Sequence, residues 1–263
     1  MAVRKRFGQH FLEAAWVAKV IEAIHPSLND EFIEIGPGRA ALTTPLTAAA
    51  KHVTVFEIDR DLARTLRESA PPNLTVVEGD FLESDWLRAN PPARRVRVAG
   101  NLPYNVASPI VFKLIDLFDG GVPIADATLM LQREVVDRLV AKPSTKEYGV
   151  LTLLVGLSAD VERLLTLPPG AFRPMPKVQS ALVRLRFHAP FPKPANRDLF
   201  AAMVTAVFTR RRKTLENALR AYQESDSERI AAALQRAGID GRRRPETLDI
   251  AEFVRLNDAF TRT

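Results

Sequence analysis

The sequence predicts an α/β fold in which a mostly parallel sheet with an antiparallel edge strand is followed by a small all-helical C-terminal domain. Two observations lead to this prediction. Short β-branched runs alternate with helical patterns from Phe32 onward, as in a parallel sheet whose strands are joined by crossover helices. Residues from Leu199 onward instead show apolar side chains at helical spacing. A chain of 263 residues can hold one full α/β core and a small second module.

The expected parallel strands are short apolar runs, and helical patterns separate them. They cover residues 32–35, 53–56, 74–77, 96–99 and 128–131. Thr44 is expected to cap one intervening helix, with Pro45 at its first position, and Asp59 to cap another that ends near Glu68. The carboxyl ends of these strands share one edge of the sheet, where open α/β sheets bind their ligands.

The residues after these strands predict an antiparallel pair at one edge of the sheet. Strand-like runs at 161–167 and 178–187 bracket a Pro-rich loop at 168–176, and a helix is expected before them over 148–157. Residues 187–197 contain three prolines and little periodicity, which indicates a linker.

The chain beyond this linker is expected to be helical. The expected helices cover residues 199–222, 228–237 and 250–260. The sequence therefore divides into a sheet domain over 1–188 and a helical domain over 189–263.

The charge balance favours a polyanionic partner, because Lys and Arg exceed Asp and Glu by 37 − 31 = 6. The excess concentrates in basic clusters at residues 4–6, 210–213 and 242–244. Each cluster alone is also typical of a solvated helix end. Together they indicate a footprint on RNA or DNA.

Composition also excludes several classes of protein. The sequence has no cysteine and four scattered histidines, so neither a disulfide nor a metal site is expected. No apolar run reaches the roughly 18 residues of a membrane span, and the basic N-terminus lacks the apolar segment of a secretory signal. We expect a cytoplasmic protein, with no membrane or metal partner, that is a monomer.

A glycine turn follows the first expected strand. Gly36 and Gly38 stand where the chain should turn into a helix, and glycine lets the backbone approach a ligand closely. Together with Ala41 they also satisfy the relaxed dinucleotide pattern, and Glu57 follows at about the 20 residues typical of a ribose-binding acid. The turn alone leaves both NAD and S-adenosylmethionine open.

Acidic residues recur at the ends of the strands beside this turn. Glu57 is placed to accept hydrogen bonds from both ribose hydroxyls. Glu34 is expected to face the ammonium group of a methionine moiety, directly or through water, and Asp80 to accept from an adenine amino group. Any one of them could be a surface acid, but their repetition favours a nucleotide-like ligand.

The segment Asn101-Leu102-Pro103-Tyr104, after the fourth strand, decides between the two cofactors. An adenine amine is a poor nucleophile because its lone pair is delocalised into the ring. Two acceptors that hold its N–H groups favour the pyramidal nitrogen that attacks a sulfonium methyl. We expect these to be the side-chain carbonyl of Asn101 and the main-chain carbonyl of Leu102, with Pro103 stiffening the turn. Tyr104 is expected to stack on the base, and no strong general base is needed.

A target base inside a duplex could not reach this segment, so it must be flipped out or already unpaired, as in structured RNA loops. Phe172 in the Pro-rich loop is expected to stack on its other face, a contact worth ~1–3 kcal/mol. Burial beneath the loop is the alternative for this ring. Lys177 is expected to meet a phosphate.

With these residues assembled, the chain resembles the bacterial small-subunit (16S) ribosomal RNA adenine N6-dimethyltransferase family. The resemblance runs nearly end to end, through residues 5–12, 34–38, 56–59, 79–81, 101–104, 172–180 and 211–215. It implies a Rossmann-like class I methyltransferase sheet with S-adenosyl-L-methionine as cofactor. It also implies two methyl transfers to each of two adjacent adenosines in a 3′-terminal loop of small-subunit rRNA, within the 30S pre-ribosomal particle.

The resemblance further assigns residues to roles. The implied cofactor-binding positions are His10, Leu12, Gly36, Glu57, Asp80 and Asn101. The family often has Asn where this chain has His10, which favours a main-chain contact there, and Ala40 interrupts the glycine pattern of many methyltransferases. The first helix of the helical domain is expected to dock on rRNA phosphates through Arg210, Arg211, Arg212 and Lys213.

Other functions stay open at this point. A methyltransferase acting on adenine in large-subunit rRNA or in DNA would need the same chemistry. An NAD-dependent oxidoreductase would explain the glycine turn and Glu57 but not the Asn-Leu-Pro-Tyr segment. A non-catalytic ribosome assembly factor could keep the cofactor fold as a scaffold.

Overall fold

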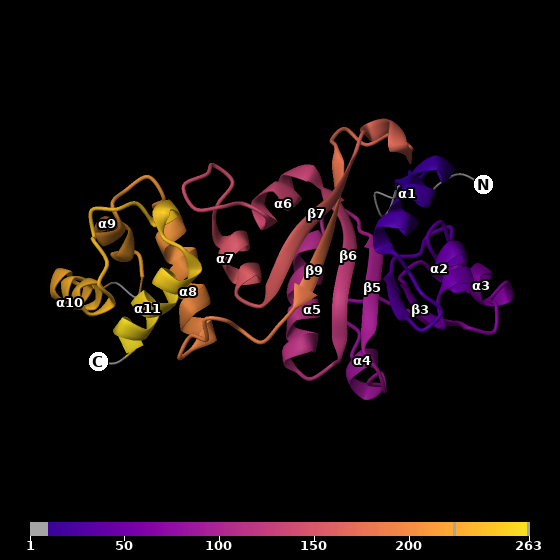
Figure 1. Ribbon diagram of the computed structural model, residues 1–263, viewed down its shortest axis with the longest axis horizontal. Helices are drawn as coiled ribbons and strands as arrows, with labels where there is room; N and C mark the ends of the chain where they lie inside the picture. The colour runs from indigo at the N-terminus through magenta and orange to yellow at the C-terminus, as the bar shows by residue number, and fades with distance from the viewer. Residues whose placement is uncertain (1–9, 223–224, 262–263) are drawn as a thin grey trace. The chain divides into compact units, whose positions relative to one another are not determined.

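The computed structural model describes residues 10–222 and 225–261 (Figure 1). These fall into two compact units. The first, here called the sheet unit, comprises the described residues up to Val136 together with Asp160–Phe187. The second, the helical unit, comprises Asp137–Ala159 together with the described residues from His188 onward. The sequence predicted residues 137–159 to be part of the sheet domain, whereas in the structure they belong to the helical unit.

A seven-stranded sheet forms the centre of the sheet unit, in the order β4-β3-β2-β5-β6-β9-β7 (Figure 1). Its strands are β2 (Glu31–Ile35), β3 (His52–Glu57), β4 (Leu74–Glu78), β5 (Val96–Asn101), β6 (Ile124–Gln132), β7 (Ala159–Leu167) and β9 (Ser180–Phe187). The strands from β4 to β6 pair in parallel, and β9 pairs antiparallel with β6. This confirms the predicted mostly parallel sheet with an antiparallel pair at one edge.

A second, two-stranded sheet was not expected from the sequence. It joins β1 (Phe11–Leu12) to β8 (Phe172–Arg173) in antiparallel register, with Leu12 opposite Phe172. The N-terminal segment therefore lies against the Pro-rich loop, although more than half of the chain separates them in sequence. This pairing fixes the position of both segments beside the sheet.

The helices of the sheet unit start where local hydrogen bonding favours them. They are α1 (Ala14–Ile24), α2 (Thr43–Ala49), α3 (Arg60–Glu68), α4 (Trp86–Ala89), α5 (Ala107–Asp119) and α6 (Arg133–Leu139), which runs into the helical unit. Asp59 caps α3 by accepting from the N–H groups of Asp61 and Leu62, as predicted. The predicted cap at Thr44 is wrong. The Thr44 N–H already donates to the carbonyl of Ala40, so helical bonding begins earlier.

The helical unit contains α7 (Val150–Gly156), α8 (Arg197–Phe208), α9 (Leu215–Leu219), α10 (Ser227–Ala237) and α11 (Ile250–Thr261). Tyr148, Leu153 and Leu157 are buried in one apolar cluster with side chains of α8 and α11. This packing explains why residues 137–159 belong to the helical unit. Residues 188–196 form neither helix nor strand, in agreement with the predicted linker.

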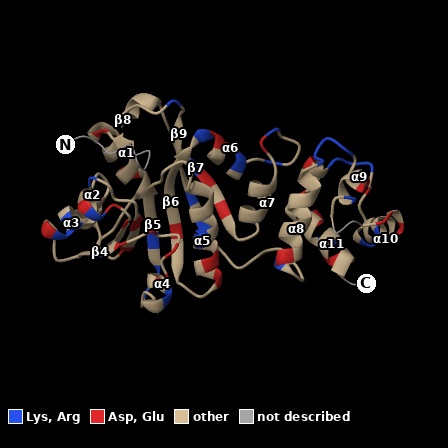
Figure 2. Cartoon of the chain, turned by 180° about the vertical axis from the view of Figure 1, so that it is seen from behind, with Lys and Arg blue, Asp and Glu red and all other residues tan. Residues whose placement is uncertain are grey.

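The single helix predicted over 199–222 is wrong, because a turn at 209–214 divides it into α8 and α9. The N–H groups of Arg210 and Arg211 donate to the carbonyls of Val207 and Phe208, three residues back, so the α-helical pattern ends there. The basic cluster therefore lies in a turn and not on a helix face. In Figure 2 the loops beside α9 are coloured blue over much of their length, which marks Lys and Arg positions.

Candidate active site

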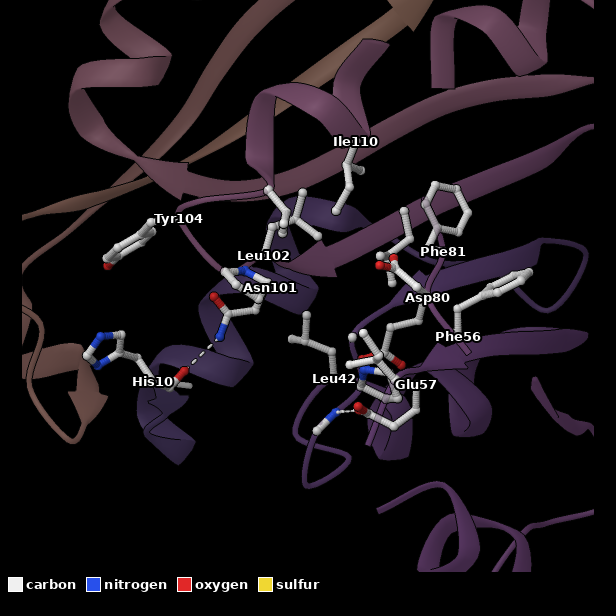
Figure 3. Close-up of a pocket in the computed structure, with 18 of the residues that line it drawn as sticks. His10, Leu42, Phe56, Glu57, Asp80, Phe81, Asn101, Leu102, Tyr104 and Ile110 are labelled. Carbon is white, nitrogen blue, oxygen red and sulfur yellow. Dashed lines mark hydrogen bonds between the residues drawn. The ribbon is translucent and has the colours of Figure 1, made fainter. Parts of the chain in front are cut away.

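A cavity of about 420 Å³ opens at the carboxyl end of the parallel strands (Figure 3). Residues at the ends of β2, β3, β4 and β5, together with β1, line it. Its lining includes every position expected to bind the cofactor and the whole Asn-Leu-Pro-Tyr segment: His10, Leu12, Gly36, Glu57, Asp80, Asn101, Leu102, Pro103 and Tyr104. Residues far apart in the sequence thus meet at one cavity.

The glycine turn forms one wall because its backbone adopts positive φ. Gly36 has φ +70° and Gly38 has φ +56°, a region that favours glycine. A Cβ at Gly36 would contact nothing within 4 Å, so the backbone conformation, not lack of space, requires glycine there. Ala40, at φ 63°, bears the same conformation with a side chain, at a cost of roughly 1 kcal/mol.

Glu57 is held by the backbone of two neighbouring loops. Its side chain is 2% exposed. Its two carboxylate oxygens accept from the N–H of Gly38 and the N–H of Asp59, each at 2.9 Å. Burial raises the pKa of Glu57, and these hydrogen bonds oppose that effect. A carboxylate oxygen accepts more than one hydrogen bond, so this rigid group can still receive ribose hydroxyls.

Glu34 is a buried acid whose second oxygen lacks a partner. Its side chain is 2% exposed, and Oε2 has no hydrogen bond among the described residues. Burial raises the pKa of Glu34 to about 7. The nearby Thr43 hydroxyl lowers this pKa in part, and the negative charge of Glu57 raises it further. No hydrogen bond of ordinary geometry joins the Thr43 hydroxyl to this carboxyl. The residue lines the cavity although Oε2 itself is shielded from solvent, so a positively charged group placed in the cavity would offset the burial of this carboxyl.

Asp80 follows the end of β4 and lies on the opposite side of the cavity from His10 (Figure 3). Its Oδ1 accepts from the N–H of Leu82 at 2.8 Å, which leaves Oδ2 for a ligand. Sequence reasoning missed the apolar residues beside it, Ile58 and Phe81, both of which line the cavity. Ile58 is 43% exposed although apolar, and its place directly after Glu57 was the available signal. Together they suit the flat faces of a purine ring.

Asn101, the last residue of β5, has a fixed side chain. Its Nδ2 donates to the main-chain carbonyl of His10 at 3.0 Å (Figure 3). This bond orients the amide so that Oδ1 faces no donor among the described residues. The N–H of Leu102 donates to the carbonyl of Met130 at 3.2 Å, which ties the segment to β6. Asn101 therefore presents a free acceptor at the cavity.

The ring of Tyr104 already has a stacking partner. The ring of His10 lies against it with centroids 5.7 Å apart and planes inclined by 28°. The Tyr104 hydroxyl bonds to Ser180 Oγ at 3.0 Å, and His10 Nδ1 bonds to the carbonyl of Pro174 at 2.7 Å. These contacts connect β1, the Asn-Leu-Pro-Tyr segment and the Pro-rich loop. They also leave at most one face of Tyr104 for a base.

The prediction that Phe172 stacks on a base is wrong for this structure. Its side chain is 1% exposed and belongs to the apolar core with Leu12, opposite which it pairs in the two-stranded sheet. A ring enclosed on both faces has no surface left for a ligand. The loop exposes Met175 instead, at 60%, and Lys177 is also exposed. Lys177 thus stays available for the predicted phosphate contact.

The predicted basic surface is only partly free. Arg211 forms an ion pair with Glu246 and donates to the carbonyls of Lys146 and Thr145, so it holds three loops together. This corrects its assignment as a phosphate contact. The exposed basic side chains on these three loops are Lys142, Lys146, Arg210, Arg212, Lys213, Arg242 and Arg244. Arg242 is paired with Asp240.

The described residues contain no cluster of acids and histidines that could hold a metal ion. Among the same residues, no helix is long and apolar enough to cross a membrane.

Comparison with known proteins identifies the family. The sequence profile described as "Ribosomal RNA adenine dimethylase" matches residues 1–262. The chain belongs to the ribosomal RNA adenine dimethylase family. It is 43% identical to "Ribosomal RNA small subunit methyltransferase A" of Acinetobacter baylyi over 259 residues, which cover 97% of this chain and 91% of the relative. Identity to the protein of the same name from Nitrosospira multiformis is 42%, covering 98% and 96%.

Two solved structures share this fold over most of the chain. A dimethyladenosine transferase from Plasmodium falciparum superposes with a TM-score of 0.78 at 25% identity, covering 94% of this chain and 96% of that one. The 23S rRNA methyltransferase ErmE gives a TM-score of 0.69 at 29% identity, covering 95% and 99%. The sheet of this family member is thus of the Rossmann-like class I methyltransferase type.

Proposed function

We propose that this protein transfers methyl groups from S-adenosyl-L-methionine to N6 of adenosines in small-subunit rRNA. The products would be two adjacent dimethylated adenosines in a 3′-terminal loop, formed during ribosome assembly in the cytoplasm. The observation that carries this proposal is the fixed amide of Asn101, whose Oδ1 is free at the edge of a cavity lined by Glu34, Glu57 and Asp80.

The residues of the cavity fit S-adenosylmethionine along its length. Glu57 would hold the ribose hydroxyls, and Asp80 with Ile58 would hold the adenine. Glu34 would take the ammonium group, directly or through water, because this buried carboxyl lines the cavity and forms no ion pair among the described residues. When bound, the cofactor supplies an electrophilic methyl group on a positively charged sulfur.

Asn101 and Leu102 would activate the target amine. The Asn101 Oδ1 and the Leu102 carbonyl accept its two N–H groups and favour a pyramidal nitrogen with an available lone pair. Held in this way, the nitrogen would accept the methyl group that the cofactor supplies, with the carbon–sulfur bond breaking as the new carbon–nitrogen bond forms. The extra proton on nitrogen leaves to solvent, so no strong base is required, and catalysis comes from position and electrostatics.

The base would reach this point only when unpaired. Tyr104 offers one ring face, since His10 lies against the other. Phe172 is buried, so the contact with the other face of the base would come from Met175, the exposed apolar side chain of the same loop. Flipping a base costs least where it is already unpaired, as in an RNA loop.

The helical unit would dock on rRNA phosphates through its three basic loops. Arg210, Arg212 and Lys213 are exposed on one of them, and the contacts of Arg211 hold the three together. Such contacts position an enzyme on RNA without reading sequence. The protein is expected to act as a monomer.

A large-subunit target is the second candidate, because ErmE shares the fold over nearly its whole length. Identity is higher to the relatives named for the small subunit, at 43% against 29%.

Labelling of both kinds of subunit tests the proposal. Unmethylated small and large subunits would be incubated separately with radiolabelled S-adenosylmethionine and the protein, and the labelled nucleosides identified. We expect N6,N6-dimethyladenosine in the small subunit. Label in the large subunit alone would favour the second candidate, and tight binding without label would favour a non-catalytic assembly factor.

A further inference from the structure

Lys113, on α5, contacts the loop that follows β4. Its Nζ donates to the carbonyl of Leu82 at 2.6 Å and to the carbonyl of Ser84 at 2.8 Å. The same ammonium lies 5.7 Å from the centroid of the Phe81 ring. These residues follow Asp80 directly, so Lys113 touches the loop that forms one wall of the cavity without lining the cavity itself.

The loop depends on these two bonds for part of its shape. On one side, Asp80 closes a tight turn: Oδ1 accepts from the N–H of Leu82, and its carbonyl accepts from the N–H groups of Glu83 and Ser84. The carbonyls of Leu82 and Ser84 face the other way, toward α5. Without Lys113, these partly buried carbonyls would lose their donor, at a cost comparable to a lost hydrogen bond.

Lys113 is itself firmly placed. It is half-buried, and the next two residues of α5, Leu114 and Ile115, are 0% and 1% exposed in the core. Among the described residues it has no carboxylate partner, so its charge is directed to the loop carbonyls. Charge-assisted hydrogen bonds of this kind are roughly twice as strong as neutral ones.

We infer that Lys113 is a positioning residue for cofactor recognition, which fixes the loop that carries Asp80 and Phe81. This inference rests on the proposed placement of the cofactor's adenine beside Asp80. Helix α5 begins just after the Asn-Leu-Pro-Tyr segment, so one rigid helix supports both the target-amine segment and the adenine loop. Nothing in the sequence pattern alone marked this lysine.

A distinct kinetic signature follows from the location of the loop. The adenine is remote from the methyl group, and its contacts are the same before and during the transfer. Loosening the loop should therefore remove uniform binding, which raises KM for S-adenosylmethionine and leaves kcat unchanged at saturation. A loss of overall stability would not separate the two parameters in this way.

The test compares Lys113→Met with Lys113→Arg, which keeps the donors. Affinity for S-adenosylhomocysteine is measured by calorimetry, and kcat and KM with small subunits. We expect Lys113→Met to weaken binding and raise KM about tenfold with kcat within twofold, and Lys113→Arg to restore most of the affinity. Lys51→Met is the matched control, because Lys51 pairs with Glu31 away from the cavity and should leave both values unchanged.

Affinity within twofold of wild type in Lys113→Met, or a fall in kcat at unchanged KM, would overturn the inference. If Lys113→Met does not fold, Lys113→Gln provides the same comparison with a smaller change. Asp80→Asn distinguishes a failure of the role of Lys113 from a failure of the adenine placement beside Asp80. Weakened binding in Asp80→Asn with normal binding in Lys113→Met removes only Lys113, whereas normal binding in Asp80→Asn overturns the adenine placement and this inference with it.

Discussion

Acidic side chains lie at both ends of the parallel sheet, but their partners differ. At the amino end, Asp30 and Asp126 both bind Arg97, at 3.0 and 3.1 Å. Arg97 also donates to the carbonyl of Ile24, at the end of α1. The two carboxylates thus share one opposite charge, which the protein itself supplies.

At the carboxyl end, no basic side chain among the described residues forms an ion pair with Glu34, Glu57 or Asp80. Glu57 and Asp80 are held by backbone N–H groups, and Glu34 keeps one oxygen without any partner. The ion pairs at the amino end favour the folded state, whereas at the carboxyl end burial raises the pKa of Glu34 and Glu57, so their ionisation opposes folding of the free protein. Substitutions at the two ends should therefore act in opposite directions.

The largest effect is expected at the amino end. Arg97→Met leaves two partly buried carboxylates without their counter-charge and should lower the free energy of unfolding by about 3–5 kcal/mol. Arg186→Met is the control, because its pair with Glu162 is exposed and should contribute below about 1 kcal/mol. Chemical denaturation measures both. Equal losses in the two variants would show that the ion pairs of Arg97 contribute no more to the free energy of unfolding than an exposed ion pair does.

Asn101→Ala tests the chemistry of the carboxyl end. Removing the free acceptor should lower kcat by roughly 10²–10³, as for other groups that stabilise a transition state, and leave S-adenosylhomocysteine affinity within about tenfold. Steady-state methylation and calorimetry measure the two quantities, with Asn90→Ala as a distant amide control. Near-normal turnover would remove Asn101 from the mechanism.

Glu34→Gln should stabilise the free protein, in contrast to Arg97→Met. The pKa of Glu34 rises from 4.5 to about 7 on folding. Ionisation of Glu34 therefore lowers the free energy of unfolding. This loss is complete above pH 7 and disappears as the pH falls below 4.5. We expect a gain on the order of 2–3 kcal/mol at pH 8 and a much smaller gain at pH 5, measured by denaturation at both values. A loss of stability at pH 8 would show that the ionised Glu34 carboxyl does not destabilise the free protein.

The smallest effect is expected at Ala40, in the turn between the glycines and α2. Glycine at this positive φ removes the clash of the side chain with the backbone, so Ala40→Gly should gain about 0.5–1 kcal/mol. Thermal unfolding would detect this change, and Ala41→Gly, a neighbouring change without positive φ, should lower stability instead. A loss in Ala40→Gly would mean that the turn is already relaxed.

Much of the fold was predictable because its signals are local. The alternating apolar runs located the parallel strands, and the Asp59 cap is a contact within four residues. Features set by distant contacts were missed. The burial of Phe172 depends on pairing with Leu12, and the loss of Arg211 as a free cation depends on Glu246.

The candidate site shows the same division. The strand-end acids and Asn101 were foreseen because parallel topology brings strand ends together. The orientation of the Asn101 amide by His10 could not be foreseen, since it joins segments 91 residues apart. The free oxygen of Glu34 was equally hidden, because only the folded structure shows which groups surround it.

The most direct test of the contrast between the two ends is the discrimination between a charged and an uncharged ligand. Binding of S-adenosylhomocysteine, which carries the ammonium group, and of 5′-methylthioadenosine, which lacks it, would be measured calorimetrically in wild type and Glu34→Gln between pH 6 and 8. We expect Glu34→Gln to weaken the binding of S-adenosylhomocysteine alone, and we expect the affinity of the wild type for this ligand to rise with pH as Glu34 ionises. Equal weakening of both ligands, or no weakening of either, would contradict this expectation.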